Sequence, residues 1–123
     1  MLWWLNDDEK LGNHARSLIG DPENDVLVSS VSLWEITVKL RISKLDADIE
    51  EILAILPKQG FYRLDITDAH LIALAALPFH HRDPFDHLLM AQAVAEEAHF
   101  VSQDQNVPLY GIPFVTCSDP VAL

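Results

Sequence analysis

The stretch "VLVSSVSLWEITVKL" (residues 26–40) reads as a strand that runs directly into a helix. It opens with three apolar residues, two of them β-branched, which is typical of a strand buried in a parallel sheet. Leu33, Ile36 and Leu40 then recur at helical spacing. This strand–helix unit predicts an α/β protein.

The same alternation continues along the rest of the chain. We expect further strands at 61–66, 99–104 and 111–117, and helices at 13–19, 46–60, 68–78 and from 83 to about 98. No repeat or linker interrupts this pattern. The sequence therefore predicts a single α/β domain over residues 1–123, built as a sandwich with a mainly parallel sheet.

Composition limits the classes of function. Eight basic and nineteen acidic side chains give a net charge of −11, so the chain is a poor general binder of nucleic acid. A polyanionic substrate would need metal ions or a partner surface to offset the repulsion. The chain has no apolar stretch long enough to cross a bilayer, no secretion signal, and Cys117 as its only cysteine. We therefore expect a cytoplasmic protein with no membrane partner.

Three acidic residues lie at equivalent places beside predicted strands. Glu35 is in the first turns of the helix after strand 26–30, Asp86 is in the first turn of a later helix, and Asp104 ends "HFVSQD" (residues 99–104). The carboxyl ends of parallel strands meet at one edge of a sheet, where ligands bind. Convergent carboxylates are the ligands that Mg²⁺ or Mn²⁺ prefers. The pattern predicts a divalent-metal site.

Each acid also has a purely structural interpretation. Ser32 and Glu35 match the spacing of a capping box. Asp83 before Pro84 matches a helix N-cap, and Asp86 lies where the helix dipole favours an acid. Asp83 can cap the helix while Asp86 points into a pocket, so the two interpretations are compatible. We expect His70 and His87 to lie on helix surfaces.

The chain resembles the PIN-domain family, specifically the VapC-like ribonuclease toxins of bacterial toxin–antitoxin pairs. The segments that carry the resemblance are "VSSVSLWEITVKLRISKL", "LDITDAHLIALAALP", "HHRDPFDHLLMAQA", "HFVSQD" and "GIPFVTC". It implies a three-layer α/β/α sandwich and Mg²⁺- or Mn²⁺-dependent cleavage of RNA. It also implies a small VapB-like antitoxin as partner, and a homodimer.

The resemblance also assigns site residues. Glu35, Asp86 and Asp104 match the family's acidic metal-site positions, and Asp83 matches a supporting aspartate of the "RDPFD" motif. Arg82 is a candidate contact for a substrate phosphate. Ser102 is a candidate to position water or phosphate, although ordinary loop polarity explains it equally well.

The start of the chain departs from the family pattern. The family opens with a strand ending in an aspartate before a stretch like "LLWWL", whereas this chain begins at Met1 with "MLWWLN". Either the start codon is assigned too far downstream, or the chain is a truncated form.

Two other functions follow from the sequence. A catalytically impaired chain would act as a binding or dimerisation module that engages only an antitoxin. A phospho-accepting receiver domain is excluded, because that site needs a lysine after its penultimate strand and the last lysine here is Lys58.

Overall fold

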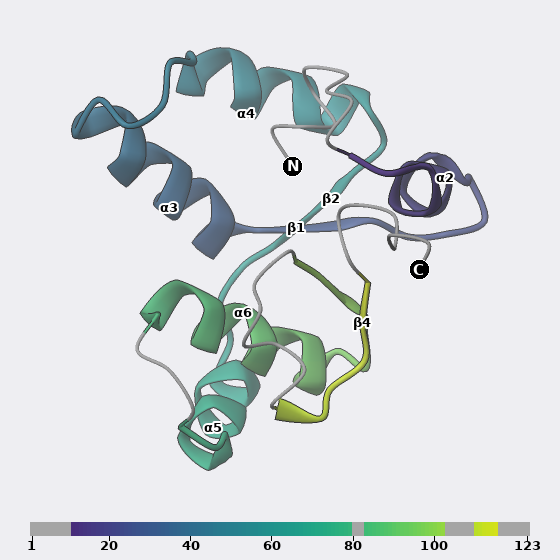
Figure 1. The fold of residues 1–123 in the computed structure, drawn as a ribbon, viewed down its shortest axis with the longest axis vertical. Coiled ribbons are helices and arrows are strands. Elements are labelled where there is room, and N and C mark those ends of the chain that lie inside the picture. The colour runs from purple at the N-terminus through teal and green to yellow at the C-terminus, as the bar shows by residue number, and fades with distance from the viewer. Residues whose placement is uncertain (1–10, 80–82, 103–109, 116–123) are drawn as a thin grey trace, which may run out of the picture.

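The computed structural model describes residues 11–79, 83–102 and 110–115. In chain order, its elements are α2 (Asn13–Gly20), β1 (Leu27–Ser29), α3 (Ser30–Arg41), α4 (Ile49–Lys58), β2 (Tyr62–Leu64), α5 (Asp68–Ala76), α6 (Pro84–Ala95), β3 (Phe100–Val101) and β4 (Phe114–Val115). Figure 1 shows α3 and α4 at one end of the molecule and α5 and α6 at the other, with β1 and β2 between them. The predicted alternation of strands and helices is confirmed.

The strands pair in parallel, as predicted. β1 pairs with β2, with Leu27 opposite Tyr62 and Ser29 opposite Leu64. β3 pairs with β4, with Phe100 opposite Phe114. The described strands thus form two separate two-stranded sheets and are shorter than predicted. The α/β class holds, and a three-layer sandwich around one sheet stays a prediction.

The start of α3 differs from the capping-box interpretation. Ser29, not Ser32, is the N-cap, and its hydroxyl accepts a hydrogen bond from the Val31 N–H at 3.0 Å. The helix begins directly after β1, so the free N–H groups of its first turn lie too early for Ser32 to cap. Glu35 consequently lies in the second turn, and the interpretation of Ser32 and Glu35 as a capping box is wrong.

Capping side chains and backbone conformation determine the other helix ends. Asp48 caps α4, and Thr67 caps α5. Helix α6 ends at Ala95, earlier than predicted, because the backbone turns at Glu97, whose φ of 53° lies in the left-handed region. A continuing helix cannot adopt that conformation.

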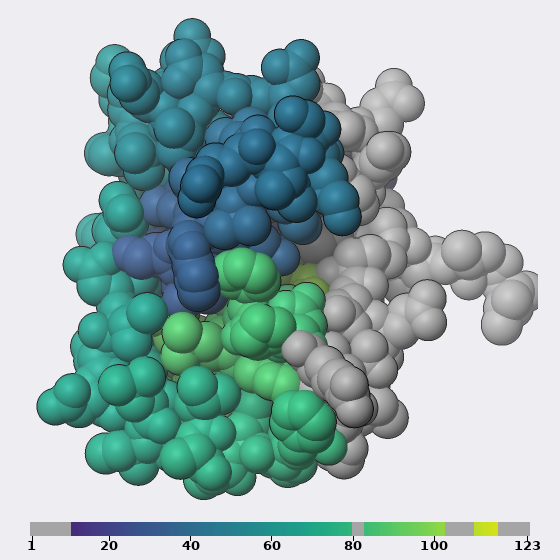
Figure 2. Space-filling view, turned by 90° about the vertical axis from the view of Figure 1, so that its left-hand side faces the viewer, coloured from purple at the N-terminus to yellow at the C-terminus, as the bar shows by residue number. Residues whose placement is uncertain are grey.

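Among the described residues, two apolar clusters lie in the interior. One joins β1, α3 and α4 through Val28, Leu33, Ile36, Ile52 and Leu56. The other packs Met90 of α6 against Tyr110. Helix α6 lies between α3 and α5, which Figure 2 shows as a green surface bordered by the blue of α3 and the teal of α5. None of the helices in the described ranges combines the length and apolar character needed to cross a bilayer.

Candidate active site

A cavity of about 450 Å³ lies between the two strand pairs. Residues of β1 and of β3 line it, and helices α3 and α6 contribute further side chains. Most of the lining is apolar. The polar exceptions include Glu35, Asp86 and Ser102, so three of the residues singled out in the sequence share one cavity.

Glu35 reaches this cavity from α3. The neighbouring Leu33 and Ile36 are buried in the core, which fixes the rotation of the helix about its axis. The Glu35 carboxylate is half-buried and forms an ion pair with Lys39 one turn later, with a Nζ–Oε2 distance of 3.5 Å. Lys39 lines the same cavity. The acid therefore faces the cavity together with a cation.

Asp86 reaches the cavity from the first turn of α6, and its residue is 9% exposed. The preceding Asp83 has a different position. Its Oδ1 accepts hydrogen bonds from the N–H groups of Phe85 at 3.0 Å and of Asp86 at 3.2 Å, which makes it the N-cap of α6. Asp83 is not among the described residues that line the cavity. One aspartate therefore caps the helix and the other lines the cavity.

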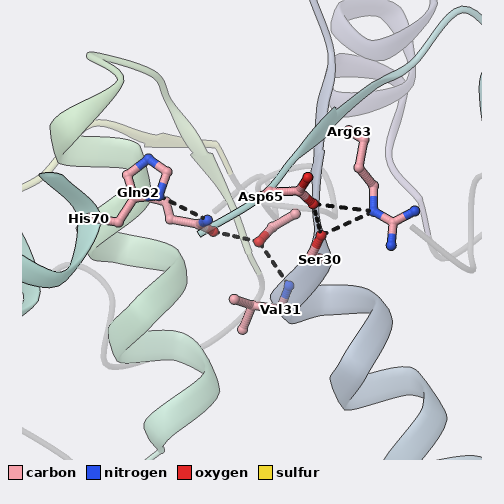
Figure 3. A network of polar contacts seen from close by, with 7 residues as sticks. Ser30, Val31, Arg63, Asp65, His70 and Gln92 are labelled. Atoms are coloured by element: carbon pink, nitrogen blue, oxygen red, sulfur yellow. Dashed lines mark hydrogen bonds and ion pairs between the residues drawn. The ribbon is translucent and has the colours of Figure 1, made fainter. Parts of the chain in front are cut away.

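A buried polar network connects the two acid-bearing helices (Figure 3). The Ser29 hydroxyl at the start of α3 donates a hydrogen bond to Oε1 of Gln92 on α6. On its other side, the Gln92 Nε2 lies 3.3 Å from Nδ1 of His70 on α5. All three residues are buried, and Gln92 also lines the cavity.

The prediction that His70 lies on a helix surface is wrong, because this residue is fully buried. Its Nδ1 accepts a hydrogen bond from the Thr67 N–H at 3.0 Å, and its Nε2 lies 2.8 Å from a Glu96 carboxylate oxygen. These contacts hold the imidazole between α5 and α6. His87 is half-buried and lies 3.0 Å from the Tyr110 hydroxyl, so it too is less exposed than predicted.

A second polar group lies at the carboxyl ends of β1 and β2 (Figure 3). The Ser30 hydroxyl donates to Asp65, and Arg63 Nε donates to the Ser30 hydroxyl at 3.1 Å. The Asp65 side chain is 80% exposed and is not among the described residues that line the cavity. This group braces the strand ends outside the cavity.

Sequence reasoning missed Gln92 and Ser29. The sequence contains a feature that indicates the role of each residue. Gln92 interrupts the apolar run "LLMAQAVA" (residues 88–95), and a polar side chain inside such a run needs a buried partner. Ser29 lies at the point where a strand becomes a helix, which is where a cap is required.

The sequence model of the PIN domain matches residues 1–113, which is most of the chain. The chain belongs to the PIN domain family. PIN domains are generally metal-dependent nucleases that act on nucleic acid. No curated protein and no solved structure matches the chain.

The donor chemistry of this PIN domain fits a hard divalent cation. Glu35 and Asp86 line one cavity, and Mg²⁺ is usually bound through one or two carboxylates while it keeps several waters. Among the described residues, no three acidic, histidine or cysteine side chains form a metal-binding group. The predicted third ligand, Asp104, and the predicted phosphate contact, Arg82, lie outside the described residues.

Proposed function

We propose that this PIN domain is a divalent-metal-dependent endoribonuclease, the toxin of a toxin–antitoxin pair, acting in the cytoplasm. The observation that carries the proposal is that Glu35 of α3 and Asp86 of α6 line one cavity. With Asp104, these carboxylates would hold Mg²⁺ or Mn²⁺. The family match supports a nuclease, and the toxin assignment rests on the resemblance of the "HHRDPFDHLLMAQA" motif.

Different residues would bind the metal and the substrate. When bound, a divalent ion lowers the pKa of water and stabilises negative charge on a phosphodiester. Asp86 is largely removed from solvent, so its carboxylate can bind a cation with little competition from bulk water. The Ser102 hydroxyl lines the same cavity and would orient a phosphate oxygen or a water. Arg82 would pair with a neighbouring phosphate.

The charge of the chain gives the metal a second role. A net charge of −11 repels RNA, and Lys39 is the only basic lysine or arginine side chain among the described residues of the cavity lining. Cations held by the carboxylates would reverse the local charge where the phosphate must sit. We therefore expect RNA binding itself, and not only cleavage, to require the metal.

An antitoxin partner is supported by exposed apolar surface near the site. Trp34 of α3 is 57% exposed and packs edge-on against Phe85 of α6, with ring centroids 4.8 Å apart. Aromatic side chains are enriched in protein–protein interfaces. We propose that the antitoxin covers this aromatic pair. Homodimer formation is a further part of the proposal and follows from the family resemblance alone.

The decisive test is cleavage of end-labelled RNA by the purified chain with Mg²⁺ or Mn²⁺, compared with the same reaction in EDTA. We expect Asp86→Asn and Glu35→Gln to abolish metal-dependent cleavage while the proteins stay folded by circular dichroism. The matched controls are Asp68→Asn and Glu51→Gln, which change first-turn acids of α5 and α4 that are not among the described cavity residues. These controls should cleave like the parent chain.

Two outcomes would contradict the proposal. If folded Asp86→Asn cleaves as well as the parent chain, the site assignment is wrong. If the parent chain binds an antitoxin but never cleaves RNA with either metal, the chain is a binding module instead.

A further inference from the structure

We infer that Gln92 is a positioning residue, which fixes the separation between the two helices that carry the acidic site. This inference rests on the proposed function, since the quantity that Gln92 controls is the spacing of Glu35 and Asp86. Gln92 lies on the same helix as Asp86, less than two turns further along. Its polar contacts reach helices α3 and α5.

The contact with α3 is made at the helix cap. The Ser29 hydroxyl accepts a hydrogen bond from the Val31 N–H and donates one to Gln92 Oε1. Because Ser29 caps the helix that carries Glu35, its hydrogen bond to Gln92 ties the start of α3 to α6. The link between α3 and α6 is therefore a hydrogen bond at the cap itself.

The contact with α5 determines which way the Gln92 amide faces. His70 Nδ1 accepts a hydrogen bond from the Thr67 backbone N–H, so this nitrogen carries no proton. The Gln92 atom that faces it must therefore be the amide nitrogen, at 3.3 Å, which leaves the carbonyl oxygen for Ser29. The proton of His70 lies on Nε2 and is donated to Glu96.

The donors and acceptors of these hydrogen bonds can be assigned in only one consistent way. A side chain that only donates or only accepts cannot replace Gln92, because it must accept from Ser29 and donate to His70. Gln92 is 1% exposed and His70 is fully buried, so a lost partner leaves a buried polar group unsatisfied. The placement of α3, α5 and α6 in the structure satisfies all of these partners. That placement is the one in which Glu35 and Asp86 line the same cavity.

The experiment measures Mn²⁺ affinity by the electron paramagnetic resonance signal of free Mn²⁺, with unfolding followed in parallel. We expect Gln92→Leu to bind Mn²⁺ at least about tenfold more weakly than the parent chain, the usual size of the effect when a group that orients a metal ligand is removed. Gln92→Asn keeps the amide on a side chain one methylene shorter, which reaches Ser29 and His70 less well, so its Mn²⁺ affinity should fall between those of the parent chain and Gln92→Leu.

The matched control is Leu56→Ala, which removes a buried apolar side chain from α4 that is not among the described residues lining the cavity. It should lower the free energy of unfolding while leaving the Mn²⁺ affinity of the folded protein within about twofold of the parent. A purely structural role for Gln92 predicts the same behaviour for Gln92→Leu.

The two proposals fail in different ways. If the parent chain binds no Mn²⁺, the proposed function fails. If the parent chain binds Mn²⁺ and folded Gln92→Leu binds it equally well, the positioning role is overturned and the nuclease proposal survives. Should Gln92→Leu not fold, Gln92→Asn decides, and an affinity equal to that of the parent chain overturns the inference.

Discussion

The hydroxyl of Ser29 donates a hydrogen bond to the side-chain carbonyl of Gln92, 63 positions later in the chain. Both residues are buried. Ser29 caps the helix that carries Glu35, and Gln92 lies on the helix that carries Asp86. The proposed site therefore rests on this tertiary contact as well as on the acids themselves.

Metal binding should stabilise the fold. A ligand that binds only the native state adds about 2.7 kcal/mol to the free energy of unfolding at a concentration one hundred times its Kd. We expect Mn²⁺ to raise the Tm of the parent chain, and EDTA to reverse the effect. Differential scanning fluorimetry of the parent chain and of Asp86→Asn measures this. An equal rise in both proteins would show that the ion binds elsewhere.

Lys39 should weaken metal binding. Its ammonium group lies 3.5 Å from the Glu35 carboxylate and lines the same cavity, so it competes with a cation for that ligand. Removing a unit charge at about 4 Å changes the interaction by roughly 1 kcal/mol in water. We therefore expect Lys39→Met to tighten Mn²⁺ binding a few-fold in calorimetric titrations at low salt.

The control for this prediction is Lys44→Met, which removes an exposed lysine that is not among the described cavity residues. Its affinity should stay close to that of the parent chain. Weaker Mn²⁺ binding in Lys39→Met would mean that the ion pair holds Glu35 in place instead of blocking it.

Asp83 should act through the helix cap. Its carboxylate accepts the N–H groups of Phe85 and Asp86. Replacing a cap with alanine costs about 1 kcal/mol, whereas asparagine caps about as well as aspartate. Urea denaturation should therefore show a loss of about 1 kcal/mol for Asp83→Ala and little change for Asp83→Asn. A large loss of RNA cleavage in Asp83→Asn, with normal stability, would instead assign this carboxylate to the chemistry.

His70 should contribute strongly to stability. In His70→Leu, the buried Gln92 amide loses a partner, and an unmet buried polar group costs about 1–3 kcal/mol, whereas Thr67 and Glu96 are exposed enough to bind water instead. We expect the free energy of unfolding to fall by about 1–3 kcal/mol, measured by urea denaturation. Leu71→Ala, at the next and 51% exposed position, should change it by less than about 0.5 kcal/mol. Equal effects of the two substitutions would contradict the network.

The local sequence predicted the element types well. The β-branched run before Ser30 and the apolar spacing of α3 identify a parallel strand–helix unit, and Asp83 with Pro84 identifies the start of α6. These features depend on neighbouring residues, whose preferences can be read directly. The same local reading misplaced the cap of α3, because Ser29 and Ser32 both fit a cap and only the end of β1 decides between them.

The burial of individual side chains could not be predicted from the local sequence in the same way. His70 lies on a helix whose residues are apolar almost all round, so periodicity does not indicate which side faces inward. His70 is buried because α6 packs against α5. Likewise, the pairing of Gln92 with Ser29 depends on the packing of α6 against α3, which no local pattern encodes.

The amino-acid order by itself determined the helices, the parallel strands and the carboxylates at helix starts, because backbone preferences and caps act over a few residues. Only the tertiary structure decided which of those carboxylates share a cavity and which buried polar groups join the helices around it. Such contacts form only when segments that are distant in the sequence pack together and exclude water. Each buried donor must then meet an acceptor from another part of the chain.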